Sequence, residues 1–141
     1  MTEPAAFQEI AENLSFLENW EDRLNYVIEL GQALPVLPEG DKTPENRVKG
    51  CVSNVWLVSE VDRTGPSATM TFKGQSDAII TKGLVAILIA LYSGRPASDI
   101  AHTDAIEWFK KIGLSEHLGM QRSNGLVAMV NRIRAEGQAL S

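Results

Sequence analysis

The sequence predicts an α+β fold, in which helices precede and follow a small antiparallel sheet of about three strands. Three observations support this prediction. Apolar residues recur every three or four positions before residue 31, alternate with polar residues between 52 and 73, and return to helical spacing beyond 76. Because the strand-like stretches form one block and do not alternate with helices, the segregated α+β class is favoured over α/β.

The N-terminal part of the chain predicts two helices. The first covers residues 5–18, and Asn19 is a suitable N-cap for the second, which runs to Gly31. Pro35 and Pro38 end the helical stretch and begin a polar connector. The apolar stripe of the first helix consists of Phe7, Ile10, Leu14 and Leu17.

A β-hairpin is predicted over residues 52–73. Its centre, DRTGPS at 62–67, is rich in turn-forming residues, and the stretches on either side alternate in polarity. Both faces of the first strand are partly apolar, so neither is expected to be fully solvated. The short piece before Gly50 is expected to add a third strand, which would place Cys51 at or near a tip of the sheet.

The C-terminal half predicts a series of helices, each beginning at a hydroxyl residue. The apolar run GLVAILIALY, residues 83–92, is too short to span a bilayer and indicates a buried helix. The last helix carries one apolar stripe, with Arg132 and Arg134 on a face expected to be solvated. The expected N-caps are Ser76 for a helix to about residue 92, Ser98 and Thr103 for two short helices, and Ser123 for the last.

Length and composition limit the classes of function. With 141 residues, the chain is expected to form one domain, residues 1–141. A net charge of −5 and a pI near 5.0 argue against nucleic acid as a partner. The acidic N-terminus does not resemble a signal peptide, and no stretch suits a membrane span, so a cytoplasmic location is expected.

The single cysteine, Cys51, is the main candidate for chemistry. A lone cysteine is most often a small buried hydrophobe. Three features of this one point to reactivity: Gly50 permits a loop conformation, the connector before it is polar, and Arg47 and Lys49 supply positive charge that favours the thiolate.

Other cysteine chemistries lack the groups that they need. A Cys–His hydrolase requires a base, but His102 and His117 are distant in sequence and carry no protease signature. A disulfide or a dithiol redox cycle requires a second cysteine, and a zinc site requires ligands at suitable spacing. A single thiolate can still exchange sulfur by displacement at a persulfide.

The stretch RVKGCVSNVWLV, residues 47–58, resembles the central motif of the SufE/CsdE family of sulfur acceptors. Three further blocks resemble the same family in the same order, so the resemblance covers nearly the whole chain. These blocks are WEDRLNYVIELGQALP (20–35), GQSDAIITKGLVAILIALYSG (74–94) and WFKKIGLSEHLGMQRSNGLVAMVNRIRA (108–135).

The resemblance implies a specific function. Cys51 would accept persulfide sulfur from a SufS/CsdA-like cysteine desulfurase, stimulate that enzyme, and pass the sulfur to an iron–sulfur scaffold complex. The protein would be a sulfurtransferase-like carrier rather than a free-standing enzyme, would need no cofactor or metal, and would resemble IscU-type scaffold proteins in fold; a homodimer is left open. The partner-facing residues would be Arg47, Lys49, Gly50, Asp77 and Arg122.

Some positions depart from the family pattern or have a simpler explanation. Lys49 replaces a common proline, and Val52 and Asn54 replace glutamines, which predicts a less rigid loop. Asp77 is explained mainly by charge–dipole stabilisation of a helix, with partner contact as a second role, whereas Arg122, just before a predicted helix, is placed unfavourably for that dipole. The alternative function is a non-catalytic regulatory binding module in which Cys51 is structural.

Overall fold

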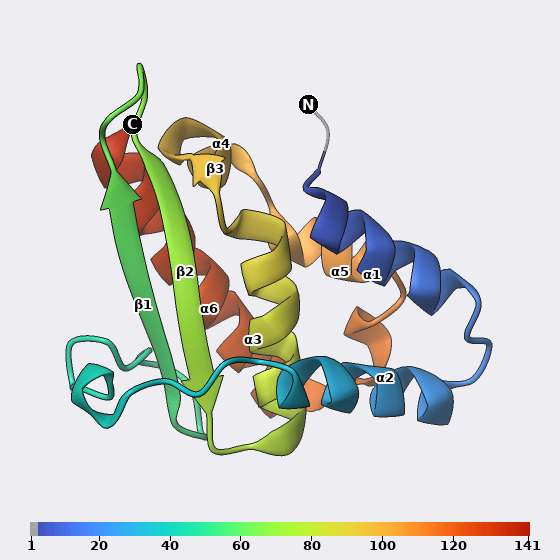
Figure 1. Cartoon of the computed structure of the whole chain (residues 1–141). Coiled ribbons are helices and arrows are strands. Elements are labelled where there is room, and N and C mark those ends of the chain that lie inside the picture. The colour runs from blue at the N-terminus through green and yellow to red at the C-terminus, as the bar shows by residue number, and fades with distance from the viewer. Residues whose placement is uncertain (1–2) are drawn as a thin grey trace.

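The computed structural model describes residues 3–141 and confirms the α+β class (Figure 1). Six α-helices, two short 3₁₀ helices and three strands follow one another along this part of the chain. In order they are α1 (Ala5–Ser15), α2 (Trp20–Gln32), η1 (Glu39–Asp41), β1 (Val55–Asp62), β2 (Thr69–Ser76), α3 (Ile79–Tyr92), β3 (Arg95–Pro96), α4 (Ala97–His102), α5 (Ala105–Lys111), η2 (Ser115–His117) and α6 (Gly119–Leu140).

The sheet is antiparallel, with the strand order β1-β2-β3. The predicted hairpin is confirmed, and its register places Val55 opposite Ser76. The prediction of a third strand just before Gly50 is wrong. That stretch forms only an isolated bridge, between Arg47 and Trp56, and the third strand is the two-residue β3.

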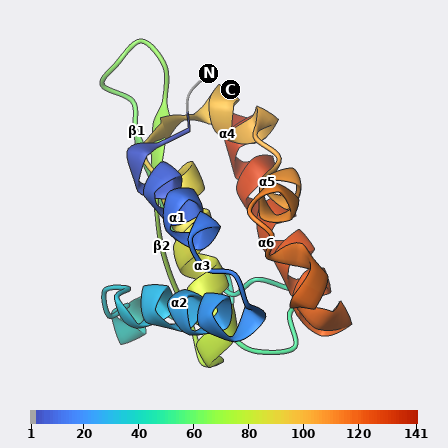
Figure 2. The ribbon, with the colours of Figure 1, turned by 90° about the vertical axis from the view of Figure 1, so that its right-hand side faces the viewer.

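Helices cover one another as well as the sheet. Helix α3 packs on β2 and is itself covered by α1 and α2, while α6 packs against α4 and α5 (Figure 2). Between α2 and α3 the backbones approach closely, because a Cβ on Gly83 would lie 2.2 Å from the Val27 carbonyl oxygen. The predicted stripe of α1 is buried at Phe7, Ile10 and Leu14, as expected.

Two of the predicted helix starts, Ser76 and Thr103, are wrong because their hydroxyls bond elsewhere. Ser76 is the last residue of β2; its hydroxyl donates to the Asn54 carbonyl at 2.8 Å and accepts from the Ala78 amide at 3.2 Å, and α3 begins only at Ile79. Thr103 donates back to the Asp99 carbonyl, and the next residue, Asp104, is the cap of α5, where its carboxylate accepts from two backbone N–H groups.

The two remaining predicted starts, Ser98 and Ser123, lie inside helices. Helix α4 begins one residue earlier than Ser98, directly after Pro96. Helix α6 begins four residues before Ser123, at Gly119, whose φ of 80° is a left-handed value. The prediction for Asn19 is confirmed, because its side chain accepts from the Asp22 amide. Within residues 3–141, none of the helices combines the length and the apolar character that crossing a membrane requires.

Candidate functional site

Cys51 follows a sharp backbone turn in the connector between α2 and β1. Gly50 has a φ of 95°, which only glycine adopts readily, and a Cβ there would lie 3.2 Å from the Ala128 Cβ of α6. The turn directs the cysteine side chain toward α6, where the Sγ lies 3.6 Å from the Gly125 carbonyl oxygen, to which the thiol donates. The thiol is half-buried, so it is neither enclosed in the core nor freely exposed.

A hollow of about 170 Å³ opens beside the thiol. We call it the thiol hollow; it is bounded by the cysteine loop (residues 50–54), the start of α3 and the first turns of α6. Gly125 keeps it open next to the sulfur, because a Cβ there would lie 3.4 Å from the Cys51 Sγ. Its lining residues are Cys51, Val52, Ser53, Ala78, Thr81, Gln121, Arg122, Gly125 and Met129.

Three large apolar side chains are exposed at or next to the residues that line this hollow. Val52 is 75% exposed, Ile79 65% and Met120 80%. Val52 belongs to the lining, and the other two are chain neighbours of lining residues. Exposed apolar side chains next to the lining of one opening are consistent with a surface that another molecule covers.

Burial and charge act in opposite directions on the thiol. Burial raises the pKa of Cys51 above its ordinary value, and the Arg47 guanidinium lowers it by a smaller amount. The expectation that Arg47 favours the thiolate therefore has the correct direction, but desolvation is the larger effect. In this structure burial therefore favours the protonated thiol over the thiolate, because it raises the pKa of Cys51.

Asp77 anchors the cysteine loop. Its carboxylate accepts from the Asn54 amide at 3.0 Å and from the Asn54 side-chain nitrogen at 2.8 Å. In return the Asp77 amide donates to the Asn54 carbonyl at 3.3 Å. Asp77 lies before α3 and not at its first position, because Ser76 is not a cap. The predicted position of Asp77 in the first turn of the helix is therefore wrong, and its hydrogen bonds are made with the loop.

Arg132 holds the connector from the other side, a role that no sequence pattern indicated. Its guanidinium donates to the carbonyls of Arg47 at 2.9 Å and Glu45 at 2.7 Å. Arg134 likewise donates to the Ala101 carbonyl at 3.1 Å. The prediction that these two arginines form a solvated face is wrong, since both bind backbone carbonyls of distant segments.

The predicted site residues fall into two groups. Arg122 lines the thiol hollow with Cys51; it lies in the first turn of α6 and donates to the Leu118 carbonyl at 3.3 Å. Arg47 and Lys49 are exposed and line a separate groove, which we call the connector groove. The connector groove is formed by Pro44, Glu45, Arg47, Val48, Lys49, Ala128 and Arg132.

The two histidines are exposed and line neither concavity. His117 stacks on Trp20 with ring centroids 4.6 Å apart, and the His102 ring bonds the Ser98 carbonyl. Over residues 3–141, no cluster of three His, Cys, Asp or Glu side chains is arranged to hold a metal ion. The hollow and its thiol are thus the chemically distinctive feature of this surface.

Comparison with known proteins places this arrangement in a family. The SufE family, described as an Fe–S metabolism associated domain, matches residues 8–137, and the chain belongs to it. An uncharacterized SufE-like protein of Rhizobium etli is 55% identical over 134 residues, which cover 95% of this chain and 90% of that protein. A second SufE-like protein, from Rhizobium meliloti, is 49% identical, covering 94% and 95% of the two chains.

A solved structure confirms the fold independently. The solution structure of a hypothetical protein from Thermus thermophilus superposes with a TM-score of 0.73, covering 99% of this chain and 98% of that one. Its sequence identity is 21%, so the likeness concerns the fold alone. The predicted similarity to IscU-type scaffold proteins stays a prediction.

Proposed function

We propose that this SufE-family protein accepts a sulfur atom from a cysteine desulfurase on Cys51 and carries it to an iron–sulfur cluster assembly scaffold. The observation that carries the proposal is a half-buried thiol at the edge of a 170 Å³ hollow, on a surface rimmed by exposed apolar side chains. Membership of a family associated with Fe–S metabolism supports the same conclusion.

The transfer is a displacement at sulfur. The Cys51 thiolate attacks the outer sulfur of the persulfide on the desulfurase cysteine; a new S–S bond forms on Cys51, the old one breaks, and the desulfurase thiolate leaves. Cys51 first loses its proton to solvent or to a partner base. The reaction needs no oxidant, reductant or cofactor, because a sulfane sulfur simply changes its carrier.

The thiol hollow suits the product of this step. A persulfide extends one atom beyond the cysteine Sγ, and the space next to that atom is open because residue 125 has no side chain. A sulfur held against Gly125 and Met129 is shielded from solvent thiols during transit. The exposed rim of Val52, Ile79 and Met120 would be covered by the partner while the sulfur is exchanged.

The decisive experiment is a mass measurement. The protein is incubated with a cysteine desulfurase and free cysteine without reductant, and its intact mass is recorded. Wild type is expected to gain one sulfur atom that dithiothreitol removes, and Cys51→Ser to gain none. Desulfurase stimulation, measured as alanine release, should also be lost in Cys51→Ser. Undiminished stimulation by this variant would instead support the regulatory module.

The cysteine loop must move for the thiol to reach a partner. Hydrogen exchange at the amides of residues 50–54 is expected to be faster than in β1, and to change when a desulfurase is added. Protection equal to that of β1 with and without the enzyme would contradict this proposal. A cytoplasmic location is part of the proposed function, because a lone cysteine stays a free thiol in that reducing compartment.

A further inference from the structure

The residues that line the connector groove carry more positive than negative charge. Its volume is about 480 Å³, and Arg47, Lys49 and Arg132 line it. Within residues 3–141 the salt bridges join Lys42 to Glu39, Lys73 to Glu60 and Lys110 to Glu107, and none of them includes a cation of the groove.

The cations of the groove are placed to receive an anion. Arg132 bonds the carbonyls of Glu45 and Arg47 through Nη1 and Nη2, which fixes its guanidinium at the groove wall. A guanidinium has five N–H donors in a planar fork, so donors remain for a carboxylate. Arg47 and Lys49 are exposed and line the same groove, so their positive charges are accessible to an anion that binds there.

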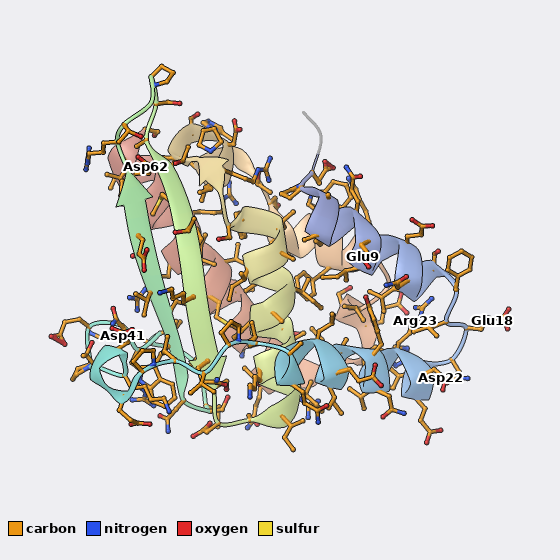
Figure 3. All side chains as sticks on the ribbon, viewed as in Figure 1. Glu9, Glu18, Asp22, Arg23, Asp41 and Asp62 are labelled. Carbon is orange, nitrogen blue, oxygen red and sulfur yellow. The ribbon has the colours of Figure 1, made fainter. Side chains whose placement is uncertain are left out.

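Several acidic side chains lie away from the connector groove. Glu9, Glu18 and Asp22 project from the α1–α2 side of the molecule, opposite the connector (Figure 3). Asp41 lies in η1 of the connector but does not line the groove. Glu45 is the acidic residue of the lining, so the groove is net positive on a chain whose net charge is −5.

We propose that the connector groove docks a carboxylate-rich segment of the partner protein that donates the sulfur. The proposal rests on the proposed function, which makes that partner a desulfurase, and it adds the chemistry by which the partner is held. Electrostatic complementarity of this kind steers the encounter and fixes the register of the two proteins.

The position of the groove supports a docking role beside the chemistry. Gly50 packs over Ala128, a residue of the groove, while Cys51 turns toward the thiol hollow. A segment bound in the connector groove would therefore contact the connector next to the cysteine loop and leave the thiol hollow open. Nucleic-acid binding requires cations along a longer path, and the net charge of this chain is −5. A protein segment therefore fits the groove better than a nucleic acid.

The first test uses a fluorescein-labelled hexaglutamate peptide and fluorescence anisotropy. Wild type is compared with Lys49→Glu and with a control, Lys110→Glu, which changes the net charge equally on an exposed part of α5. We expect Lys49→Glu to weaken peptide binding by about tenfold, the control to bind as wild type, and added salt to abolish binding. Equal binding to all three proteins, or binding to none, would overturn the proposal.

The second test measures sulfur loading against carrier concentration with a desulfurase. Lys49→Glu should need about tenfold more protein for half-maximal loading and reach the same plateau, because Cys51 is intact. A carbodiimide, which joins amines to carboxylates, should link Lys49 but not Lys110 to the desulfurase. If wild type gains no sulfur, the proposed function is refuted. The peptide experiment still shows whether the connector groove binds a carboxylate-rich segment. A single-stranded oligonucleotide that displaces hexaglutamate would overturn the assignment to a protein segment.

Discussion

Replacing Gly125 by alanine separates the proposed carrier function from stability, because the two should change in opposite directions. Gly125 lies inside α6, where alanine is the better helix former by about 0.8–1 kcal/mol. The new Cβ would lie 3.4 Å from the Cys51 Sγ and 3.9 Å from its Cβ, which are ordinary contact distances. Gly125→Ala should therefore raise the free energy of unfolding by up to about 1 kcal/mol.

The same methyl group occupies the space that the outer sulfur of a persulfide requires. Adding an atom to a filled site costs about 1–3 kcal/mol, which corresponds to roughly 5- to 150-fold less persulfide at equilibrium. The assay is the intact-mass measurement at several ratios of carrier to desulfurase, with urea unfolding for stability. Alkylation of the free thiol should continue, because the unmodified Cys51 still fits.

A matched control distinguishes the helix effect from the hollow. Asn131→Ala improves helix propensity at an exposed position of α6 that does not line the thiol hollow. It should gain stability and load sulfur as wild type does. If Gly125→Ala also loads like wild type while its stability rises, the hollow does not hold the sulfur, and this interpretation of the site is refuted.

Three further variants test other parts of the structure. Arg47→Ala should raise the pKa of Cys51 further, so iodoacetamide should alkylate the thiol more slowly at neutral pH. Arg47→Lys keeps the positive charge and should largely preserve the rate. An unchanged rate in Arg47→Ala would contradict the electrostatic role of Arg47. Asp77→Ala removes the acceptors that hold the cysteine loop, and the loop amides should exchange about 5- to 30-fold faster in hydrogen exchange, with the central strand unchanged. Gly83→Ala forces a Cβ to within 2.2 Å of the Val27 carbonyl oxygen, so the free energy of unfolding should fall by about 1–3 kcal/mol or more in urea titration; a smaller loss would mean that α2 and α3 can separate easily.

Much of the fold follows from local patterns in the sequence. The hairpin and the helix of residues 79–92 were predictable because polarity alternates in the first and apolar residues dominate the second. Helix starts were less predictable, because a hydroxyl can bond several neighbours. Thr103 donates back to the preceding helix, and Asp104 caps α5 instead.

The candidate site was predictable only where one residue carries the signal. Cys51 is unique in the chain, and Gly50 before it indicates a turn. The residues that hold the connector could not be predicted, because Arg132 bonds carbonyls that lie 85 and 87 residues away in sequence. Every residue has a backbone carbonyl, so no sequence pattern marks the carbonyls that an arginine binds. Such an arginine cannot be distinguished in the sequence from a solvated one.

The contacts that hold the cysteine loop closed are strong enough to order it and weak enough for a partner to release it. Opening breaks the Asp77–Asn54 hydrogen bonds and the weak thiol bond to Gly125, while Arg132 still holds the connector before the loop. Counting three Asp77–Asn54 bonds and the thiol bond at about 0.5–1 kcal/mol each, we expect opening to cost about 2–4 kcal/mol, so that on the order of 1% of molecules present the thiol at any time. In the remainder, burial favours the protonated thiol, which is the less reactive form. A partner must bind the open form about 5.5 kcal/mol more tightly than the closed form to reverse a 1:99 ratio, and we propose that the apolar rim and the connector groove supply this difference. The same loop can therefore protect the thiol in the free protein and offer it in the complex.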